Sequence, residues 1–142
     1  MLATRTEIES FIPQRNPFVA VHEILKATDE LLISQFEVLA ENIFVTGGIL
    51  HEAGLIENIA QTAAAQMGYV CKQKGIPVPI GYIASIKNLK VYKLPPTGSV
   101  LSTSVQVTNR VMDFMLVDGK IRSGENNICE CEMRIFVEPT KA

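Results

Sequence analysis

The sequence predicts an α+β fold in which one antiparallel sheet wraps around a single long helix. Apolar residues recur with the helical period from Ile56 to Val70, and Gly75 and Pro77 end that pattern. After this helix, polar and apolar residues alternate with a period of two, which is typical of strands with one buried face. Runs of strands on either side of one buried helix indicate an α+β fold rather than alternating βαβ units.

The expected elements follow from these patterns and from the turn residues between them. The long helix spans about 20 to 24 residues, hence about 30 to 36 Å. It has little charge before Lys72, so we expect it to be covered on most sides. The other expected elements are a short helix over 4–11 and strands over 18–25, 31–40, 82–94, 100–111, 113–124 and 127–139.

Length and composition predict one domain, spanning residues 1–142, with ordinary globular character. The chain has 47% apolar residues, 20% charged residues and a formal net charge of -2. The absence of basic excess argues against nucleic acid or an anionic membrane as the main partner. The sequence has no run of about 18 apolar residues, so we expect no membrane-spanning helix. The opening residues lack the apolar core of a signal peptide. We therefore expect a cytoplasmic protein.

The cysteines predict neither a disulfide framework nor a metal site. Cys71, Cys129 and Cys131 are an odd and sparse set. Cys129 and Cys131 are two residues apart in a predicted strand, so their thiols share one face. No metal-ligand or nucleotide motif accompanies them, so no cofactor is expected.

Polar residues near the start of the long helix mark a candidate site. Burying the Glu57 carboxylate among the apolar residues around it costs free energy, which indicates that this group has a function. A glycine in a helix costs roughly 1 kcal/mol relative to alanine, which favours close approach of a ligand or another backbone. One helical face carries this glycine and three polar residues: Gly54, Glu57, Asn58 and Gln61.

Three segments carry a resemblance to the hotdog-fold 3-hydroxyacyl-acyl carrier protein dehydratases. IPQRNPFVAVHEIL (12–25) is similar to the family's opening motif, and IENIAQ (56–61) is similar to V-E-A-x-A-Q on its central helix. KNLKVYKLPPTGSVL (87–101) is similar to a stretch that ends V-x-P-G-D-x-L. The resemblance implies a hotdog fold and a substrate carried as an acyl thioester of acyl carrier protein or CoA. It also implies a homodimer, with higher or mixed hotdog assemblies left open.

The chain departs from the family at positions that matter for catalysis. Gln14 replaces a histidine of the opening motif, and His22 replaces its aspartate. The family's H-F-P-G-x-P-x-x-P-G segment is absent, and its catalytic histidine falls on Ile43, although Phe44 is kept. The family's general base is therefore missing in an ungapped register.

The resemblance implies a role for each candidate residue. Glu57 matches the family's acid, which protonates the leaving 3-hydroxyl, and an apolar setting would keep it protonated. His51 is either a relocated base, acting within one chain or across a dimer, or a cap of the helix. Gln61 either orients Glu57 or satisfies neighbouring backbone, and Asn58 is interpreted as structural. The candidate substrate-binding residues are Gly54, Gln61, Phe44 and Gly48.

Three functions remain open at this point. The first is a dehydratase that converts 3-hydroxyacyl thioesters to 2-enoyl thioesters. The second is an acyl thioesterase, which needs Glu57 ionised as a base or nucleophile rather than protonated. The third is a non-catalytic acyl-binding or partner subunit. The basic run of Lys87, Lys90 and Lys93 is either a solvated strand face or a surface for an acidic carrier protein.

Overall fold

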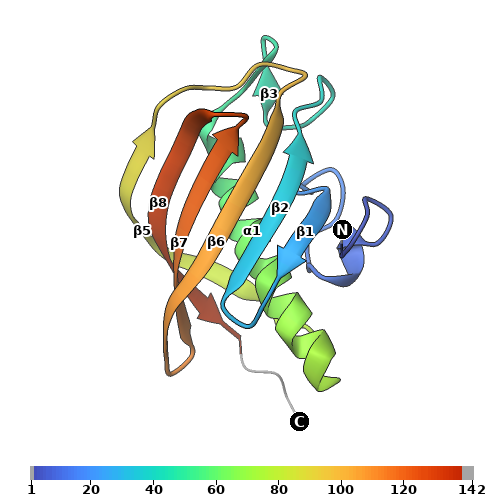
Figure 1. Cartoon of the computed structure of the whole chain (residues 1–142), viewed down its shortest axis with the longest axis vertical. Helices are drawn as coiled ribbons and strands as arrows, with labels where there is room; N and C mark the ends of the chain where they lie inside the picture. Colours follow the sequence, from blue (N-terminus) through green and yellow to red (C-terminus); the bar gives the residue numbers. More distant parts are fainter. Residues whose placement is uncertain (1, 139–142) are drawn as a thin grey trace.

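A six-stranded antiparallel sheet wraps around one long helix, which confirms the predicted α+β hotdog architecture (Figure 1). The computed structural model describes residues 2–138. The strand order in the sheet is β1-β2-β6-β7-β8-β5, and β3 and β4 form a separate small hairpin. The elements are η1 (Ile8–Ser10), β1 (Glu23–Ala27), β2 (Leu31–Glu37), β3 (Val45–Thr46), β4 (Ile49–Leu50), α1 (Glu52–Lys74), β5 (Gly81–Val91), β6 (Val100–Val111), β7 (Phe114–Ser123) and β8 (Asn126–Val137).

The predicted long helix is confirmed as α1, with 23 residues. Gly75 ends it in the left-handed conformation (φ 68°), and its N–H bonds to the carbonyl of Lys72. Buried residues continue along α1 as far as Cys71, after which the helix is exposed from Lys72 to Lys74. No helix within residues 2–138 is long and apolar enough to cross a membrane.

The main core lies between α1 and the concave face of the sheet. Ile59 of α1 belongs to the same buried cluster as Val105, Val117 and Met133 from β6, β7 and β8. The sheet approaches the helix so closely that a Cβ at Gly119 would lie 2.4 Å from Cγ2 of Ile59. Cys129 and Cys131 are both buried on this side, which confirms that they share one face of β8.

The segment between η1 and β1 differs from the prediction, because the long helix binds its backbone. We call residues 11–20 the strap. The predicted strand over 18–25 begins only at Glu23, since side chains of α1 hydrogen-bond to the backbone of Phe18 and Ala20. The strap crosses α1 at Gly68, where a Cβ would lie 2.0 Å from the carbonyl oxygen of Phe11.

The predicted N-terminal helix over 4–11 is reduced to one turn and the three-residue η1. Glu7 closes the first turn, because its carboxylate accepts bonds from both the backbone N–H and the hydroxyl of Thr4. The chain then leaves the helical path and enters the strap. The predicted helix therefore does not continue beyond this short segment.

A hairpin that the sequence did not predict positions the start of α1. Gly47 (φ 63°) and Gly48 (φ 75°) link β3 to β4, and two consecutive positive φ angles define a type I′ turn. The hairpin is fixed to the bend before β6, since Thr97 N–H bonds to the Gly48 carbonyl and Leu50 N–H to the Pro95 carbonyl.

The two edges of the sheet are different. The N-terminal segment covers β1, where Ala3 and Ile24 exchange backbone hydrogen bonds. Along β5, the edge away from β8 pairs with no other strand among the described residues. This edge strand exposes large apolar side chains, with Tyr82 53%, Ile83 40% and Leu89 39% exposed. An open apolar edge is a place where a second chain can pair.

Candidate active site

Glu57 lies in the wall of a cavity of about 220 Å³ between α1, the strap and the β5 edge. The helix contributes residues at successive turns of one face, and the strap contributes Gln14. The remaining wall comes from β5 and β8. The full lining is Gln14, Glu57, Ala60, Ala64, Met67, Gly81, Tyr82, Ile83 and Ile135. The cavity is therefore mostly apolar, and its polar side chains are those of Glu57, Gln14 and Tyr82.

The environment of Glu57 favours its protonated form. Burial raises the pKa of the Glu57 carboxyl above its ordinary value, while the hydrogen bond from Gln61 opposes that rise. Desolvation is the larger of the two effects. The upward direction of this shift is the one that a proton-donating carboxyl requires.

Gln61 holds Glu57 and the strap at the same time. Its Nε2 donates to Glu57 Oε2 at 2.7 Å and to the carbonyl of Phe18 at 2.8 Å. Its Oε1 accepts the N–H of Ala20 at 2.6 Å. All three interactions come from one fully buried side chain, so both sequence interpretations of Gln61 hold together: it orients Glu57 and it satisfies backbone.

Asn58 has a structural position. Its Nδ2 donates to the carbonyl of Ala20 at 2.8 Å, and its Oδ1 accepts the hydroxyl of Thr103. Asn58 is fully buried and lines no cavity with Glu57. It therefore links the strap, α1 and β6.

His51 is the N-cap residue of α1, although its side chain makes no capping hydrogen bond. The ring is exposed, and its Nε2 lies 3.1 Å from the carbonyl oxygen of Thr46 in the hairpin. His51 precedes Glu57 by six positions, which on an ideal helix corresponds to about 9 Å along the axis and a rotation of about 120°. Within one chain, His51 does not line the Glu57 cavity.

The other candidate substrate-binding residues gather near the helix start, apart from the cavity. A Cβ at Gly54 would lie 2.7 Å from Cβ of Phe44 and 2.6 Å from Cδ1 of Leu50. The absence of a side chain at Gly54 thus lets the hairpin region pack against α1. Phe44 is half-buried against the main core, and Gly48 is exposed at the turn of the hairpin. Ile43, which aligns with the family's histidine, is 48% exposed.

Sequence reasoning missed most of the cavity wall. Ala60, Ala64 and Met67 follow Glu57 at intervals of three, seven and ten residues, so the helical period could have placed them beside it. Gln14 stood out only as a departure from a family motif. The contribution of β5 had no local signal, because it depends on how the sheet closes around α1.

Within residues 2–138, the other polar groups form no further candidate cluster. Among residues 2–138, no group of three His, Cys, Asp or Glu side chains is arranged to hold a metal ion. The larger hollow, about 390 Å³, lies over β5–β8 and excludes Glu57. There Lys87 is in register with Glu132, and nearby Lys90 is in register with Glu130, so acidic neighbours balance part of the predicted basic run.

Comparison with solved structures defines the class of protein: a hotdog-fold chain. One chain of the dehydratase heterocomplex ApeI:P from Xenorhabdus doucetiae matches with a TM-score of 0.88 and 16% identity, over 94% of this chain and 91% of that one. A hypothetical thioesterase with coenzyme A from Streptococcus pneumoniae TIGR4 matches with a TM-score of 0.67 and 16% identity, over 84% and 88%. The PaaI protein of E. coli matches with a TM-score of 0.63 and 13% identity, over 80% and 81%.

The family follows from the sequence. The ApeP-like family, described as ApeP dehydratase, matches residues 6–142. The chain belongs to this family, which confirms the resemblance to a divergent hotdog dehydratase. A comparison with curated proteins finds no match.

Proposed function

We propose that this chain is a dehydratase subunit that acts on 3-hydroxyacyl thioesters, with Glu57 as the acid. The observation that carries the proposal is the half-buried Glu57 carboxyl, raised in pKa, in the wall of a mostly apolar cavity. In the reaction, the C3–O bond breaks as the hydroxyl takes the Glu57 proton and leaves as water. A base removes the proton at C2, and that electron pair forms the double bond. The acyl chain would occupy the apolar part of the cavity.

Among the described residues, a single chain does not place a general base beside Glu57. The family's histidine position holds Ile43, and His51 lies outside the cavity. We propose that the base comes across a subunit interface. His51 of a second copy is one source. A histidine from a different hotdog chain is the other, and the similar protein from Xenorhabdus doucetiae is part of a heterocomplex.

The β5 edge supports a site completed by a second chain. Tyr82 and Ile83 line the Glu57 cavity and lie on the unpaired edge strand. A strand added along this edge would cover the exposed parts of both side chains and exclude water from the cavity. In this proposal the interface lies directly beside the acid.

The thioester carrier is proposed from the class of substrate. An acyl group on the pantetheine arm of acyl carrier protein or of CoA would present the same reacting atoms to Glu57. A structurally similar thioesterase contains coenzyme A. A cytoplasmic location, where such thioesters are made, is part of the same proposal.

The thioesterase alternative uses the same carboxylate in the opposite protonation state. A hydrolytic base or nucleophile must be ionised. The raised pKa of Glu57 favours the acid instead. Hydrolysis therefore remains the second candidate, supported by the fold of the thioesterase neighbours alone.

The test is to incubate the purified protein with a short 3-hydroxyacyl thioester or its 2-enoyl counterpart on acyl carrier protein. Mass spectrometry then follows gain or loss of water together with release of free thiol. The variants are Glu57→Gln and His51→Ala, with Glu125→Gln on an exposed turn as the matched control. Each protein is assayed alone and mixed with a histidine-containing hotdog dehydratase.

The outcomes separate the candidates. Water exchange that is lost in Glu57→Gln, by about 100-fold or more, supports the proposal. Loss in His51→Ala as well assigns the base to a second copy, whereas activity that needs the mixed assembly assigns it to the other chain. Thiol release that depends on Glu57 selects the thioesterase. Equal turnover of Glu57→Gln and the unmodified chain contradicts any catalytic role for Glu57.

A further inference from the structure

Gln14 is a polar residue in the wall of the Glu57 cavity that the mechanism has not used. Its Oε1 is buried and has no hydrogen-bond partner among the described residues. The side-chain amide also makes no other hydrogen bond within residues 2–138, in contrast to Gln61, whose amide is fully bonded. An unpaired buried acceptor is unfavourable unless a partner satisfies it.

The only other unpaired buried side-chain oxygen of residues 2–138 belongs to Gln66, and its setting differs. Gln66 is fixed by two bonds from its Nε2 to the carbonyls of Thr28 and Asp29, at 3.1 and 2.7 Å. It faces backbone and does not line the cavity of Glu57. Of the two, Gln14 is therefore the one whose side chain lines the cavity together with Glu57.

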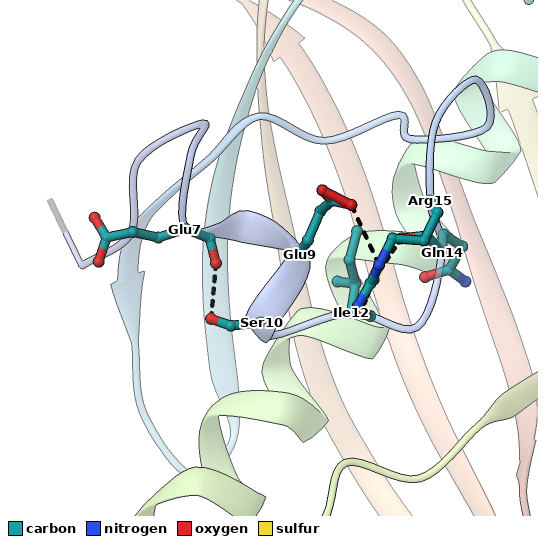
Figure 2. A network of polar contacts seen from close by, with 6 residues as sticks. All are labelled: Glu7, Glu9, Ser10, Ile12, Gln14 and Arg15. Carbon is teal, nitrogen blue, oxygen red and sulfur yellow. Dashed lines mark hydrogen bonds and ion pairs between the residues drawn. The ribbon is translucent and has the colours of Figure 1, made fainter.

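The strap holds Gln14 in a defined place. Arg15 donates from Nη1 to the carbonyls of Ile12 and Gln14, both at 2.8 Å, and its Nε lies 3.2 Å from Oε1 of Glu9 (Figure 2). Ile12 is only 2% exposed and belongs to a second buried cluster, separate from the main core. These contacts hold the backbone on both sides of Gln14, so its side chain starts from a defined place in the cavity wall.

We propose that Gln14 recognises the 3-hydroxyl group of the substrate. The inference rests on the proposed dehydratase function. The hydroxyl oxygen accepts the hydrogen bond of protonated Glu57, and its own O–H donates to Oε1 of Gln14. A hydroxyl has one proton to donate and lone pairs to accept, so these two residues satisfy it together.

This arrangement makes Gln14 a specificity-determining residue. A site built to bond a hydroxyl discriminates against an analogue that lacks it, because the buried polar group is then left unpaired. A saturated acyl thioester and the 2-enoyl product both lack the hydroxyl. Gln14 therefore favours binding of the substrate over binding of the product after water has left.

The experiment measures binding rather than turnover. The probes are 3-hydroxybutyryl-pantetheine and butyryl-pantetheine, each with an amide in place of the thioester so that neither is hydrolysed. Isothermal titration calorimetry gives both dissociation constants for the protein in the assembly in which it is purified. The variant is Gln14→Met, which keeps the side-chain length without polar atoms, and Gln73→Met on the exposed end of α1 is the matched control.

We expect the unmodified protein and Gln73→Met to bind the hydroxylated probe about 5- to 20-fold more tightly than the saturated one. Gln14→Met should lose most of that ratio through weaker binding of the hydroxylated probe alone. Gln14→Asn withdraws the amide by one methylene and should lower the ratio in the same way, so the test does not depend on one variant folding.

Two negative results are distinguishable. If Gln14→Met or Gln14→Asn binds both probes with the unmodified ratio, Gln14 does not recognise the hydroxyl, while the dehydratase proposal stands. If the unmodified protein binds neither probe, the acyl-thioester function itself is contradicted, and the role of Gln14 with it.

Discussion

The amide of Gln61 donates to the Glu57 carboxylate at 2.7 Å while the same side chain bonds to the backbone of Phe18 and Ala20. The acid and the strap are thus held by one residue. Replacing Gln61 with Leu should leave the buried Ala20 N–H and the part-buried Phe18 carbonyl without their partners. The expected loss in the free energy of unfolding is about 2 to 6 kcal/mol, since each of the two unpaired groups costs about 1 to 3 kcal/mol.

Urea denaturation of Gln61→Leu beside Gln73→Leu measures this loss. The exposed Gln73 control should change the free energy of unfolding by less than about 0.5 kcal/mol. In the same variant the Glu57 pKa should rise further, because the Gln61 hydrogen bond lowers it. A carboxyl titration by NMR that shows no rise would contradict the assigned hydrogen bond.

For Gly68→Ala, the sign of the change in the free energy of unfolding tests whether the strap crosses α1 at this residue. In an open helix, Gly→Ala stabilises by roughly 1 kcal/mol through helix propensity. At Gly68 the new Cβ would lie 2.0 Å from the Phe11 carbonyl oxygen, so the strap must move. Gly68→Ala should therefore destabilise the protein by about 1 to 3 kcal/mol, measured by chemical denaturation. A stabilised variant would mean that the strap does not cross α1 there.

The fold was predictable from the sequence where local patterns were strong. A hydrophobic period of 3.6 residues, ended by Gly75, predicted the bounds of α1 closely. A period of two residues did the same for β6. The strap was not predictable as such. FVAVHEIL has strand composition, but Asn58 and Gln61, about 40 residues later, take the hydrogen bonds that a strand would use.

The candidate site was predictable only in part, for a similar reason. Glu57 was identifiable because a carboxylate on an apolar helix face is unusual, and Gln61 because of its helical spacing. The hydrogen bond of His51 to Thr46 and the place of Gln14 beside Glu57 depend on the hairpin and the strap. Neither can be read from residues nearby in the sequence.

Removing the Glu57 charge should stabilise the protein at higher pH. Because burial raises the pKa of Glu57 in the folded state, that state retains the proton after the unfolded chain has lost it. The Glu57 contribution to stability therefore falls as pH rises from the unfolded value through the folded one. At pH values above this range, Glu57→Gln should have a larger free energy of unfolding than the unmodified protein. At pH values below it, the two proteins should be similarly stable.

Urea denaturation at a series of pH values, with Glu125→Gln as the exposed control, measures this difference. The gap between Glu57→Gln and the unmodified protein should widen with pH and then become constant. A gap that narrows with rising pH would indicate a lowered Glu57 pKa and would contradict its role as the acid.

His22 has the opposite effect on acid stability. Burial, assisted by the charge of Arg5 and opposed by Glu37, lowers the pKa of His22 from 6.5 to about 4. Between these pH values the unfolded chain binds more protons than the folded one, so stability falls as pH is lowered through the window. The ring also accepts the Glu37 N–H through Nδ1 at 3.1 Å.

His22→Asn removes the titration and keeps a possible acceptor for that N–H. Thermal unfolding from pH 7 to pH 4 should show a weaker loss of stability in this variant than in the unmodified protein. Equal losses would mean that His22 is accessible enough to be protonated in the folded state.

The buried amides of α1 also restrict how the sequence itself can change. Asn58, Gln61 and Gln66 reach the backbone of distant segments from fixed positions along one helix. One inserted or deleted residue between them would rotate the following part of α1 by about 100° and withdraw every later amide from its partner. Length changes should therefore be tolerated in the exposed turn around Gly124 but not between Asn58 and Gln66. The spacing of these three positions should be the most invariant length along the chain as the family diverges.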